Sequence, residues 1–446
     1  MSHYNKLILV TGATGYIASR LIPQLLDRGY IVRVLARNPQ CLRSRNWHGR
    51  VEIKQGDVMD TASLAAALKD VHTAYYLIHS MSSGVGYTKL ETQAARSFSL
   101  AAEVAGVQHI IYLGGLADDE SGNISPHMLS RIKTGETLMQ GKVPVTEFRA
   151  SVIIGSGSTS FEMIRFMTEL FPIVPSHPWL KNKSQPIAVQ NVIDYLLSAL
   201  EKWEKTDSVL EIGGPDIMTY QEIMQRYARA RGHKRKFLFL PYIPVRLMAF
   251  GVGLVTPVPR LIARALVRGM SDDSIVQHKN AHEVYPEIHP IDFDTATRLA
   301  LENLHPLKIE RVWEADIENS GASRSGTAIN KHEGFFIKYK KVMVYNQATP
   351  VYKVISKIAA GLGKRRFVIE TIEHNKLLLL RAEQKASGAG WLEWRVEPCG
   401  ETTALTQTIF FAPRGWSGFA YWYFLYPIHM LTFYYLLQKI KDECNP

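Results

Sequence analysis

The string TGATGYIA at residues 11–18 has the residue types and spacing of a phosphate-binding turn. Gly12 allows the chain to turn tightly. Gly15 lets backbone N–H groups approach a pyrophosphate at the start of a helix, where the helix dipole favours negative charge. Ala18 is small enough for that helix to pack close to the preceding strand. The string therefore predicts a site for a dinucleotide, with a plain structural turn as the alternative.

The end of the next apolar run, IVRVLA at residues 31–36, indicates which dinucleotide binds. Sites that prefer NAD place an Asp or Glu there to hold the ribose hydroxyls. This chain has Arg37 instead, followed by Asn38, and Arg33, Arg43 and Arg45 are close in the sequence. Arginine can pair with a 2′-phosphate through its charge and its forked donors. We therefore expect NADP(H) rather than NAD(H); a solvent-exposed loop arginine is the alternative for Arg37.

His127 and Arg131 are the candidates for chemistry on a bound substrate. Ser125 and Pro126 have the pattern of a helix start, so His127 and Arg131 lie one turn apart on one helical face. A histidine can move a proton near neutral pH, whereas an arginine can hold a ribose or phosphate but cannot act as a base. The alternative is an ordinary first-turn histidine beside a phosphate clamp or surface charge.

Alternating strands and helices must position these residues. Short apolar runs predict strands at residues 6–10, 31–36, 51–55, 73–79, 109–115 and 145–151. Helical patterns lie between them, at about residues 16–28, 88–105 and 126–141. This order predicts an α/β fold with a doubly wound parallel Rossmann sheet, whose ligand lies across the carboxyl ends of the strands.

Two strand ends should add residues to the site. Asp57 follows the third strand, near the expected adenine position. Tyr75, Tyr76 and His79 end the fourth strand, close to the expected nicotinamide, although core packing is an equal alternative for the two tyrosines. The residues expected to bind the dinucleotide are Thr11, Gly12, Thr14, Gly15, Tyr16, Ile17, Arg37, Asp57 and Val58.

The bulk composition limits the other classes of function. Lys and Arg outnumber Asp and Glu by 52 to 41 in 446 residues, which gives a formal net charge of +11. This charge favours anionic partners, with a solvated basic surface as the simpler alternative. No nucleic-acid motif accompanies that charge, so we expect no nucleic-acid partner. The 3 cysteines show neither a disulfide framework nor metal spacing, and we expect no metal. We find no signal peptide and expect a cytoplasmic protein.

The pattern changes in the last third of the chain. Residues 317–330 are rich in Ser and Gly, which predicts a linker. Strand-like runs then follow at residues 335–345, 364–374, 376–385, 391–398 and 403–413, with helical runs at about 350–362 and 416–441. An α+β domain with a helix-grip-like arrangement is expected, in which a curved antiparallel sheet holds a long C-terminal helix.

Three segments raise the question of a membrane. Residues 415–438 contain no Asp, Glu, Lys or Arg, but Pro427, His429 and many aromatic residues favour a buried gripping helix over a span. Residues 331–366 hold nine Lys or Arg and one acid, and would support peripheral contact with anionic lipid, with a solvated sheet edge protected by lysines as the alternative. The apolar residues 241–270 could form a lid over a substrate or touch a membrane, with a buried helix pair as the simpler alternative.

The first part of the chain, about residues 1–315, resembles the extended and atypical short-chain dehydrogenase/reductases. The matching strings are TGATGYIA (11–18), LARNP (35–39), GDV (56–58), IIYLGG (110–115), PVTEFRASVIIGSG (144–157), QPIAV (185–189) and EIGGPDIMTY (211–220). The resemblance implies a Rossmann domain with a small substrate lobe. Active members of that superfamily carry a Ser or Thr after the fifth strand and a Tyr-x-x-x-Lys pair. Here those positions fall on Gly114-Gly115, His127 and Arg131.

The C-terminal part resembles an uncharacterised domain found behind atypical short-chain dehydrogenases, of a START-like shape. The strings RAEQKASGAGWLEWRVEP and FAYWYFLYPIHML carry this resemblance, which implies an apolar cavity for a lipid-like molecule. We therefore expect a dehydrogenase-like domain at residues 1–316, a linker at 317–330 and a START-like domain at 331–446. The predicted function is NADP(H)-dependent reduction of an apolar small molecule. The alternative is a non-catalytic NADP(H)-binding protein with a hydrophobic ligand in its C-terminal pocket.

Overall fold

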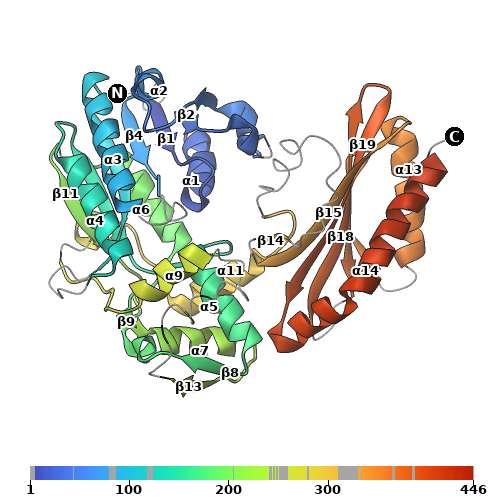
Figure 1. Ribbon diagram of the computed structural model, residues 1–446. Helices are drawn as coiled ribbons and strands as arrows, with labels where there is room; N and C mark the ends of the chain where they lie inside the picture. Colours follow the sequence, from blue (N-terminus) through green and yellow to red (C-terminus); the bar gives the residue numbers. More distant parts are fainter. Residues whose placement is uncertain are drawn as a thin grey trace.

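The fold consists of an α/β part and an antiparallel sheet backed by two helices, seen at the two sides of Figure 1. The computed structural model describes residues 6–43, 45–79, 87–117, 124–203, 205–240, 244, 247, 250, 260–278, 281–309, 330–332, 334–363, 367–383 and 387–444. The predicted linker lies outside these residues, except for Asn330, which begins the first strand of the second part. Most of the apolar segment 241–259, with Arg246, lies outside them too.

A seven-stranded sheet forms the centre of the first part, in the order β11-β6-β5-β4-β1-β2-β3. All of its neighbouring strands pair in parallel, as the alternating pattern predicts. Its strands are β1 Leu7–Thr11, β2 Ile31–Ala36, β3 Glu52–Gln55, β4 Thr73–Tyr76, β5 His109–Gly115, β6 Val145–Ala150 and β11 Ser208–Ile212. The doubly wound fold is confirmed; the edge strand β11 adds to the six strands expected from the sequence.

Helices cover both faces of this sheet, because its strands carry apolar side chains on both sides. Helices α1 (Tyr16–Asp27) and α6 (Val189–Glu201) pack on one face through a core cluster that includes Leu21, Val34 and Leu196. Helices α2 (Thr61–Leu68), α3 (Tyr87–Val104) and α4 (Pro126–Met139) contribute to the cluster on the other face. The two layers hold the strands' carboxyl ends in fixed positions.

A smaller lobe is built from the later segments of the first part, below the sheet in Figure 1. Its short strands pair as β7 (Ile153–Ile154) with β10 (Ile187–Ala188), β8 (Ile173–Ser176) with β13 (Lys236–Phe239), and β9 (Lys183–Ser184) with β12 (Met218–Thr219). Its helices are α5 Thr159–Leu170, α7 Tyr220–Ala230, α9 Arg260–Gly269 and α11 Phe293–Glu302. Helix α10 (Ala281–Val284) packs instead in the core of the main sheet through Ala281. Short 3-10 helices are η2 Pro39–Leu42 and η3 His48–Arg50 near β2, and η5 Pro178–Lys181 in the lobe.

The second part is a six-stranded sheet in the order β14-β15-β19-β18-β17-β16, antiparallel throughout. Its strands are β14 Asn330–His332, β15 Phe335–Val344, β16 Phe367–Glu373, β17 Leu377–Ala382, β18 Gly388–Cys399 and β19 Thr402–Pro413. Helices α13 (Ala348–Gly363) and α14 (Gly415–Cys444) cover the face that points away from the first part (Figure 1). One core cluster joins both helices to the sheet, which confirms a helix-grip-like arrangement.

Helix α14 has one buried and one exposed apolar face. Phe419, Trp422 and Leu437 are buried, whereas Phe424 is 84% exposed. The other large exposed apolar residues of this helix are Trp416, Tyr423, Ile428, Leu431 and Tyr435. Among the described residues, no helix has the length and hydropathy needed to cross a membrane.

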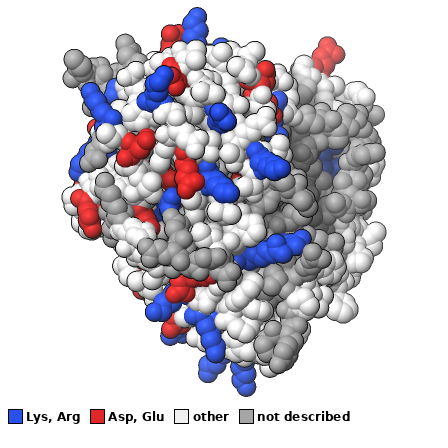
Figure 2. Space-filling view, turned by 60° about the vertical axis from the view of Figure 1, so that its left-hand side comes forward, with Lys and Arg blue, Asp and Glu red and all other residues white. Residues whose placement is uncertain are grey.

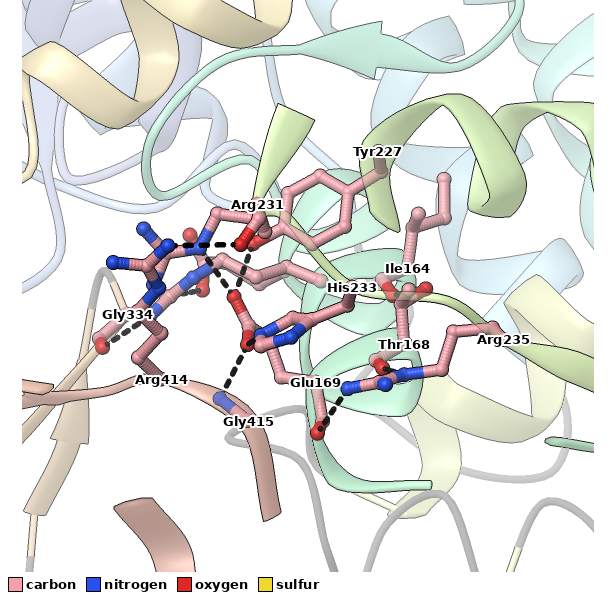
Figure 3. A network of polar contacts seen from close by, with 12 residues as sticks. Ile164, Thr168, Glu169, Tyr227, Arg231, His233, Arg235, Gly334, Arg414 and Gly415 are labelled. Atoms are coloured by element: carbon pink, nitrogen blue, oxygen red, sulfur yellow. Dashed lines mark hydrogen bonds and ion pairs between the residues drawn. The ribbon is translucent and has the colours of Figure 1, made fainter. Parts of the chain in front are cut away.

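Buried polar contacts join the two parts at the start of α14 (Figure 3). The Glu169 carboxylate, from the last turn of α5, accepts a hydrogen bond from the backbone N–H of Gly415 at 2.6 Å. Nearby, Arg165 donates to the carbonyl of Gly334 at 2.9 Å and pairs with Glu162 at 2.8 Å. Acidic and basic side chains are interspersed on the face shown in Figure 2, so the excess of positive charge does not form one patch there.

Candidate functional site

The glycine-containing turn lies between β1 and α1 and has the geometry that the sequence predicts. Gly12 has a φ of +66°, and a Cβ there would lie 2.4 Å from the carbonyl oxygen of Leu77, so only glycine fits. The N–H of Gly15 donates to the carbonyl of Gly12 at 2.8 Å, which closes the turn at the first residue before α1. Ala18 is buried against the sheet. The turn therefore presents the N-terminus of α1 to the strand ends.

Eight of the nine residues expected to bind the dinucleotide line one cavity; they are Gly12, Thr14, Gly15, Tyr16, Ile17, Arg37, Asp57 and Val58. The ninth, Thr11, is fully buried and is not part of the cavity wall. Its hydroxyl donates to the carbonyl of Tyr75 at 3.0 Å and accepts from the N–H of Leu77 at 3.1 Å. The Thr11 side chain thus joins β1 to the end of β4 by hydrogen bonds and does not face a ligand.

The arginines near β2 have different environments. Arg37 is exposed at the end of the strand and lines the cavity, where it can meet a phosphate. Arg33 pairs with Glu52 at 2.7 Å and donates to the carbonyl of Ala67, so its environment is structural. Arg45 is only 5% exposed, and its guanidinium donates to the carbonyl of Thr14 at 3.1 Å. Sequence proximity alone did not separate these environments.

The cavity has a volume of about 890 Å³ and extends beyond the glycine turn into the smaller lobe. Asp57, whose carboxylate accepts from the N–H of Met59 at 2.9 Å, lies at one end of it. The other end has apolar walls from α5, β8, η5, α7 and α9. These residues are Met163, Ile164, Met167, Val174, Leu180, Met224, Leu266, Val267 and Met270. A polar crevice and an apolar chamber therefore form one space.

His127 and Arg131 lie on the wall of this cavity, on α4. Ser125 caps the helix by accepting from the N–H of Met128 at 3.3 Å, as the sequence predicts. Burial, followed by His79 and Arg131, lowers the pKa of His127 to about 3, so its imidazole is neutral at physiological pH. The Arg131 guanidinium donates to the carbonyl of Leu113, at the end of β5.

His79 also lines the cavity, and it contacts Glu91 on α3. The two side chains meet at 2.6 Å, between His79 Nδ1 and Glu91 Oε1. Ser130 donates to the other carboxylate oxygen of Glu91, and the rings of His79 and His127 stack at 4.9 Å.

Glu91 and Ser130 were missed from the sequence, although a signal for Glu91 was present. Glu91 shares a helical face with small and apolar residues that are all buried, namely Ala94, Ala95, Phe98 and Ala102. An acid within an otherwise apolar stripe must be compensated by partners, because a buried unpaired charge is costly.

Tyr75 and Tyr76 lie in the core, so the packing alternative is the correct one for both. Tyr75 is fully buried, and its hydroxyl donates to the carbonyl of Leu196 on α6 at 2.8 Å. Tyr76 packs against Phe98 and Tyr112 on the other face of the sheet. Alternation along β4 sends the two rings to opposite faces, away from the strand's end.

The glycines at the end of β5 fit the packing around them. A Cβ on Gly114 would lie 2.5 Å from Oε1 of the buried Glu147, and one on Gly115 would lie 2.5 Å from Cε of Met128. Both positions are thus filled by neighbouring side chains. Within the described ranges, no group of His, Cys, Asp or Glu is arranged to hold a metal ion.

Two family models match the chain. The model described as the NmrA-like family matches residues 4–314, which contain the whole cavity. A model described as a protein of unknown function, DUF2867, matches residues 342–436, within the antiparallel sheet and its helices.

Curated proteins similar to the chain include reductases. The chain is 32% identical over 115 residues to cinnamoyl-CoA reductase 1 of Oryza sativa subsp. japonica, which covers 24% of the chain and 33% of that protein. It is 26% identical over 250 residues to the chloroplastic divinyl chlorophyllide a 8-vinyl-reductase of Zea mays, which covers 52% of the chain and 61% of that protein. The chain thus spans less than two thirds of these relatives.

Solved structures share the fold of the first part. A triphenylmethane reductase of Citrobacter sp. has a TM-score of 0.53 at 20% identity, covering 66% of this chain and 99% of that chain. An NADPH-dependent quinone oxidoreductase of Escherichia coli, complexed with NADPH, has a TM-score of 0.53 at 18% identity, covering 65% of this chain and 98% of that chain.

Proposed function

We propose that this chain, which belongs to the NmrA-like family of NAD(P)-binding proteins, is a reductase that uses NADPH to reduce an apolar small molecule. One observation carries the proposal. A single cavity of about 890 Å³ joins the glycine-containing turn to the apolar chamber of the smaller lobe, and His79 and His127 lie on its wall. A dinucleotide site continuous with a substrate-sized chamber is the arrangement that hydride transfer needs.

The residues at the polar end suit a dinucleotide. The glycines allow the tight turn, because a Cβ on Gly12 would meet the carbonyl of Leu77 and one on Gly15 would meet the carbonyl of Gly12. The N-terminus of α1 directs backbone N–H groups and a partial positive charge toward a pyrophosphate. Asp57 and Val58 would hold the adenine end. Bound NADPH would supply the hydride; the chain's own residues must orient the substrate and provide a proton.

The choice of NADPH over NADH rests on Arg37. It is exposed on the cavity wall at the end of β2, where NAD-binding sites carry a carboxylate. A 2′-phosphate there would gain a charge-assisted hydrogen bond, whereas the unmodified ribose of NADH would not. The buried Arg45, which donates to the carbonyl of Thr14, adds positive charge behind the turn.

The apolar substrate is inferred from the far end of the cavity. Met163, Met167, Met224 and Met270 line it, and methionine adapts its shape to different apolar ligands. Among the described residues, those that line this cavity lie between residues 12 and 274, and none of them comes from the C-terminal sheet. We therefore assign the apolar ligand to the smaller lobe rather than to a C-terminal pocket.

A non-catalytic NADP(H)-binding protein is the second candidate. The observation that favours it is the replacement of the superfamily's Tyr and Lys by His127 and Arg131. The neutral His127 is a poor acid. His127 could still polarise a carbonyl by hydrogen bonding, and Arg131 could hold a ribose or phosphate. Turnover of bound NADPH separates the candidates, because only a reductase consumes it.

Filling the apolar chamber tests the proposal. Met167→Trp places a large ring in the chamber, far along the cavity from the glycine turn. We expect turnover of an apolar acceptor to fall at least about 10-fold, the scale on which a misplaced substrate affects rate, while NADPH affinity stays unchanged. Met343→Trp is the control, because Met343 is exposed on β15, outside the cavity. Equal turnover in both variants would contradict the assignment of the chamber to the substrate.

A further inference from the structure

Three elements bring a histidine, a carboxylate and a hydroxyl together behind the cavity wall. His79 follows β4, Glu91 lies on α3 and Ser130 lies on α4. The Glu91 carboxylate is buried, with one oxygen 2.6 Å from His79 Nδ1 and the other accepting from the Ser130 hydroxyl. Both carboxylate oxygens are thereby held, so Glu91 can fix the orientation of the His79 ring.

This arrangement determines which nitrogen of His79 is left for another contact. An ionised carboxylate only accepts hydrogen bonds, so Nδ1 carries the hydrogen that lies between His79 and Glu91. The other nitrogen, Nε2, is buried and has no hydrogen-bond partner within the part of the chain that the structure describes. His79 itself lines the cavity. A polar atom without a partner beside a ligand chamber is suited to a contact that only a ligand completes.

His127 and Arg131 are less suited to donate a proton. Nδ1 of His127 is also buried without a hydrogen-bond partner among the described residues, and no carboxylate among them is hydrogen-bonded to its ring. The hydrogen bond with Glu91 favours the protonated form of His79, whereas His127 has no such bond and burial lowers its pKa to about 3. The guanidinium of an arginine is not a proton donor in acid–base chemistry, and that of Arg131 donates a hydrogen bond to the carbonyl of Leu113. The geometry therefore favours His79.

We propose that His79 is the proton donor of the reductase, with Glu91 as the residue that positions it; this inference rests on the proposed function. A carbonyl substrate that takes a hydride at its carbon gains an electron pair at its oxygen. The Nε2–H bond of protonated His79 breaks, its electron pair stays on the imidazole, and an O–H bond forms on the product. Oxidised nicotinamide is the co-product, and solvent returns the proton to Nε2.

The charges around His79 set the expected pH dependence. Burial is the main cause that lowers the pKa of His79, and Arg131 acts in the same direction, while Glu91 opposes both. His127, stacked on His79, is neutral. The pKa of His79 therefore lies below its ordinary value of 6.5. Protonated His79 becomes more abundant as the pH falls toward this lowered pKa. Reduction should therefore speed up toward acid pH and slow as the pH rises.

The first test needs no substrate. Nitrogen NMR of protein labelled in its histidines reports which ring nitrogen carries hydrogen, and the His79 signals are those absent from His79→Asn. We expect His79 at neutral pH to carry hydrogen on Nδ1 and none on Nε2. Glu91→Gln should lower the pKa of His79, because the opposing negative charge is gone. Hydrogen on Nε2 instead of Nδ1 would overturn the inference, whether or not a substrate is known.

The second test uses turnover. His79→Asn and His79→Gln should each lower turnover by about 100-fold or more, the usual scale for a positioned acid, with NADPH affinity unchanged. Glu91→Gln should move the acid-side rise in rate to lower pH. Native turnover in the His79 variants, or loss of the pH dependence in His127→Ala alone, would overturn the inference while the proposed function stands. If the native protein binds NADPH and never oxidises it, the proposed function fails, and the donor role with it.

Discussion

The Glu169 carboxylate lies 2.6 Å from the backbone nitrogen of Gly415, so a side chain of the smaller lobe caps the long C-terminal helix. The same carboxylate accepts from the Tyr227 hydroxyl at 2.9 Å and pairs with Arg231 at 2.6 Å and His233 at 3.1 Å (Figure 3). Burial by itself would raise the pKa of Glu169, but His233, Arg231, Arg165 and the Gly415 N–H hold it well below its ordinary value of 4.5. The two parts of the fold are therefore joined through a buried charge.

Removing this carboxylate should destabilise the protein. Glu169→Ala leaves Arg231 and the start of α14 without their partner, and we expect a loss of about 3 kcal/mol in the free energy of unfolding, measured by denaturant titration. Glu302→Ala is the control, since Glu302 forms an exposed pair with Arg298 that is worth less than about 1 kcal/mol. Equal losses in the two variants would show that the buried carboxylate adds no more stability than an exposed ion pair.

The lowered pKa of Glu169 also predicts how stability depends on pH. Because the pKa is lower in the folded state than in the unfolded state, the carboxylate's contribution is complete above pH 4.5 and declines as the pH falls below it. Glu169→Gln cannot titrate at this position. We expect the stability difference between the native protein and Glu169→Gln to shrink as denaturation is measured at progressively lower pH. A difference that stays constant would contradict the assignment.

The choice of cofactor is tested at Arg37. The native protein should bind NADPH about 10-fold tighter than NADH, because a charge-assisted hydrogen bond to the 2′-phosphate is worth about 1.5 kcal/mol or more. Arg37→Asp should remove or reverse this preference in calorimetry. Arg229→Asp, an exposed arginine on α7 outside the cavity wall, should leave it unchanged. Equal native affinities for the two dinucleotides would rule out Arg37 as the phosphate contact.

The glycine turn should be required for dinucleotide binding of either kind. In Gly15→Val a Cβ would lie 3.0 Å from the carbonyl oxygen of Gly12, and the branched side chain would stand where the pyrophosphate meets α1. NADPH binding should be lost while circular dichroism shows a retained fold. Gly49→Val is the control, because a Cβ there has nothing within 4 Å. Unaltered binding in Gly15→Val would place the phosphates elsewhere.

The exposed face of α14 tests the expectation of peripheral membrane contact. Trp416, Phe424, Ile428, Leu431 and Tyr435 form an uncharged apolar surface on one helix, and such surfaces mark interaction sites. We expect the protein to sediment with vesicles that contain anionic lipid, and Phe424→Ser with Leu431→Ser to reduce that binding.

Val104→Ser, a change at an exposed apolar residue of α3, is the control for the vesicle experiment. It should leave binding intact. If the native protein ignores vesicles and instead forms a dimer that the α14 substitutions dissociate, this face binds a second copy of the chain.

Most of the sheet and the phosphate turn could be predicted from the sequence, because local patterns determine them. Strands and turns depend mainly on residues that are neighbours in the chain. This holds for the strands before Gly12 and at residues 31–36 and 109–115, and for the turn with Gly12, Gly15 and Ala18. The helices and strands of the C-terminal part follow their apolar patterns in the same way.

The surroundings of His79 could not be predicted equally well, because the partners of this residue come from distant elements. His79 and Glu91 meet only after β4 and α3 pack together, and Ser130 reaches them from α4. Thr11 belongs to the predicted turn, yet its hydroxyl is used between β1 and β4. The sequence shows that Arg33, Arg37 and Arg45 are charged. It does not show that Arg33 and Arg45 bond to backbone carbonyls, because those contacts depend on tertiary packing.

The transfer of hydride itself is the most direct test of the account. The protein should be incubated with NADPH carrying deuterium at the transferable position of the nicotinamide, together with apolar carbonyl compounds, quinones and conjugated alkenes, and the products analysed by mass spectrometry. We predict that at least one apolar acceptor gains deuterium as NADPH absorbance falls, and that Gly15→Val abolishes this transfer. The account would be contradicted if bound NADPH stayed reduced with every acceptor and no product contained deuterium. That result would identify the chain as a binding protein.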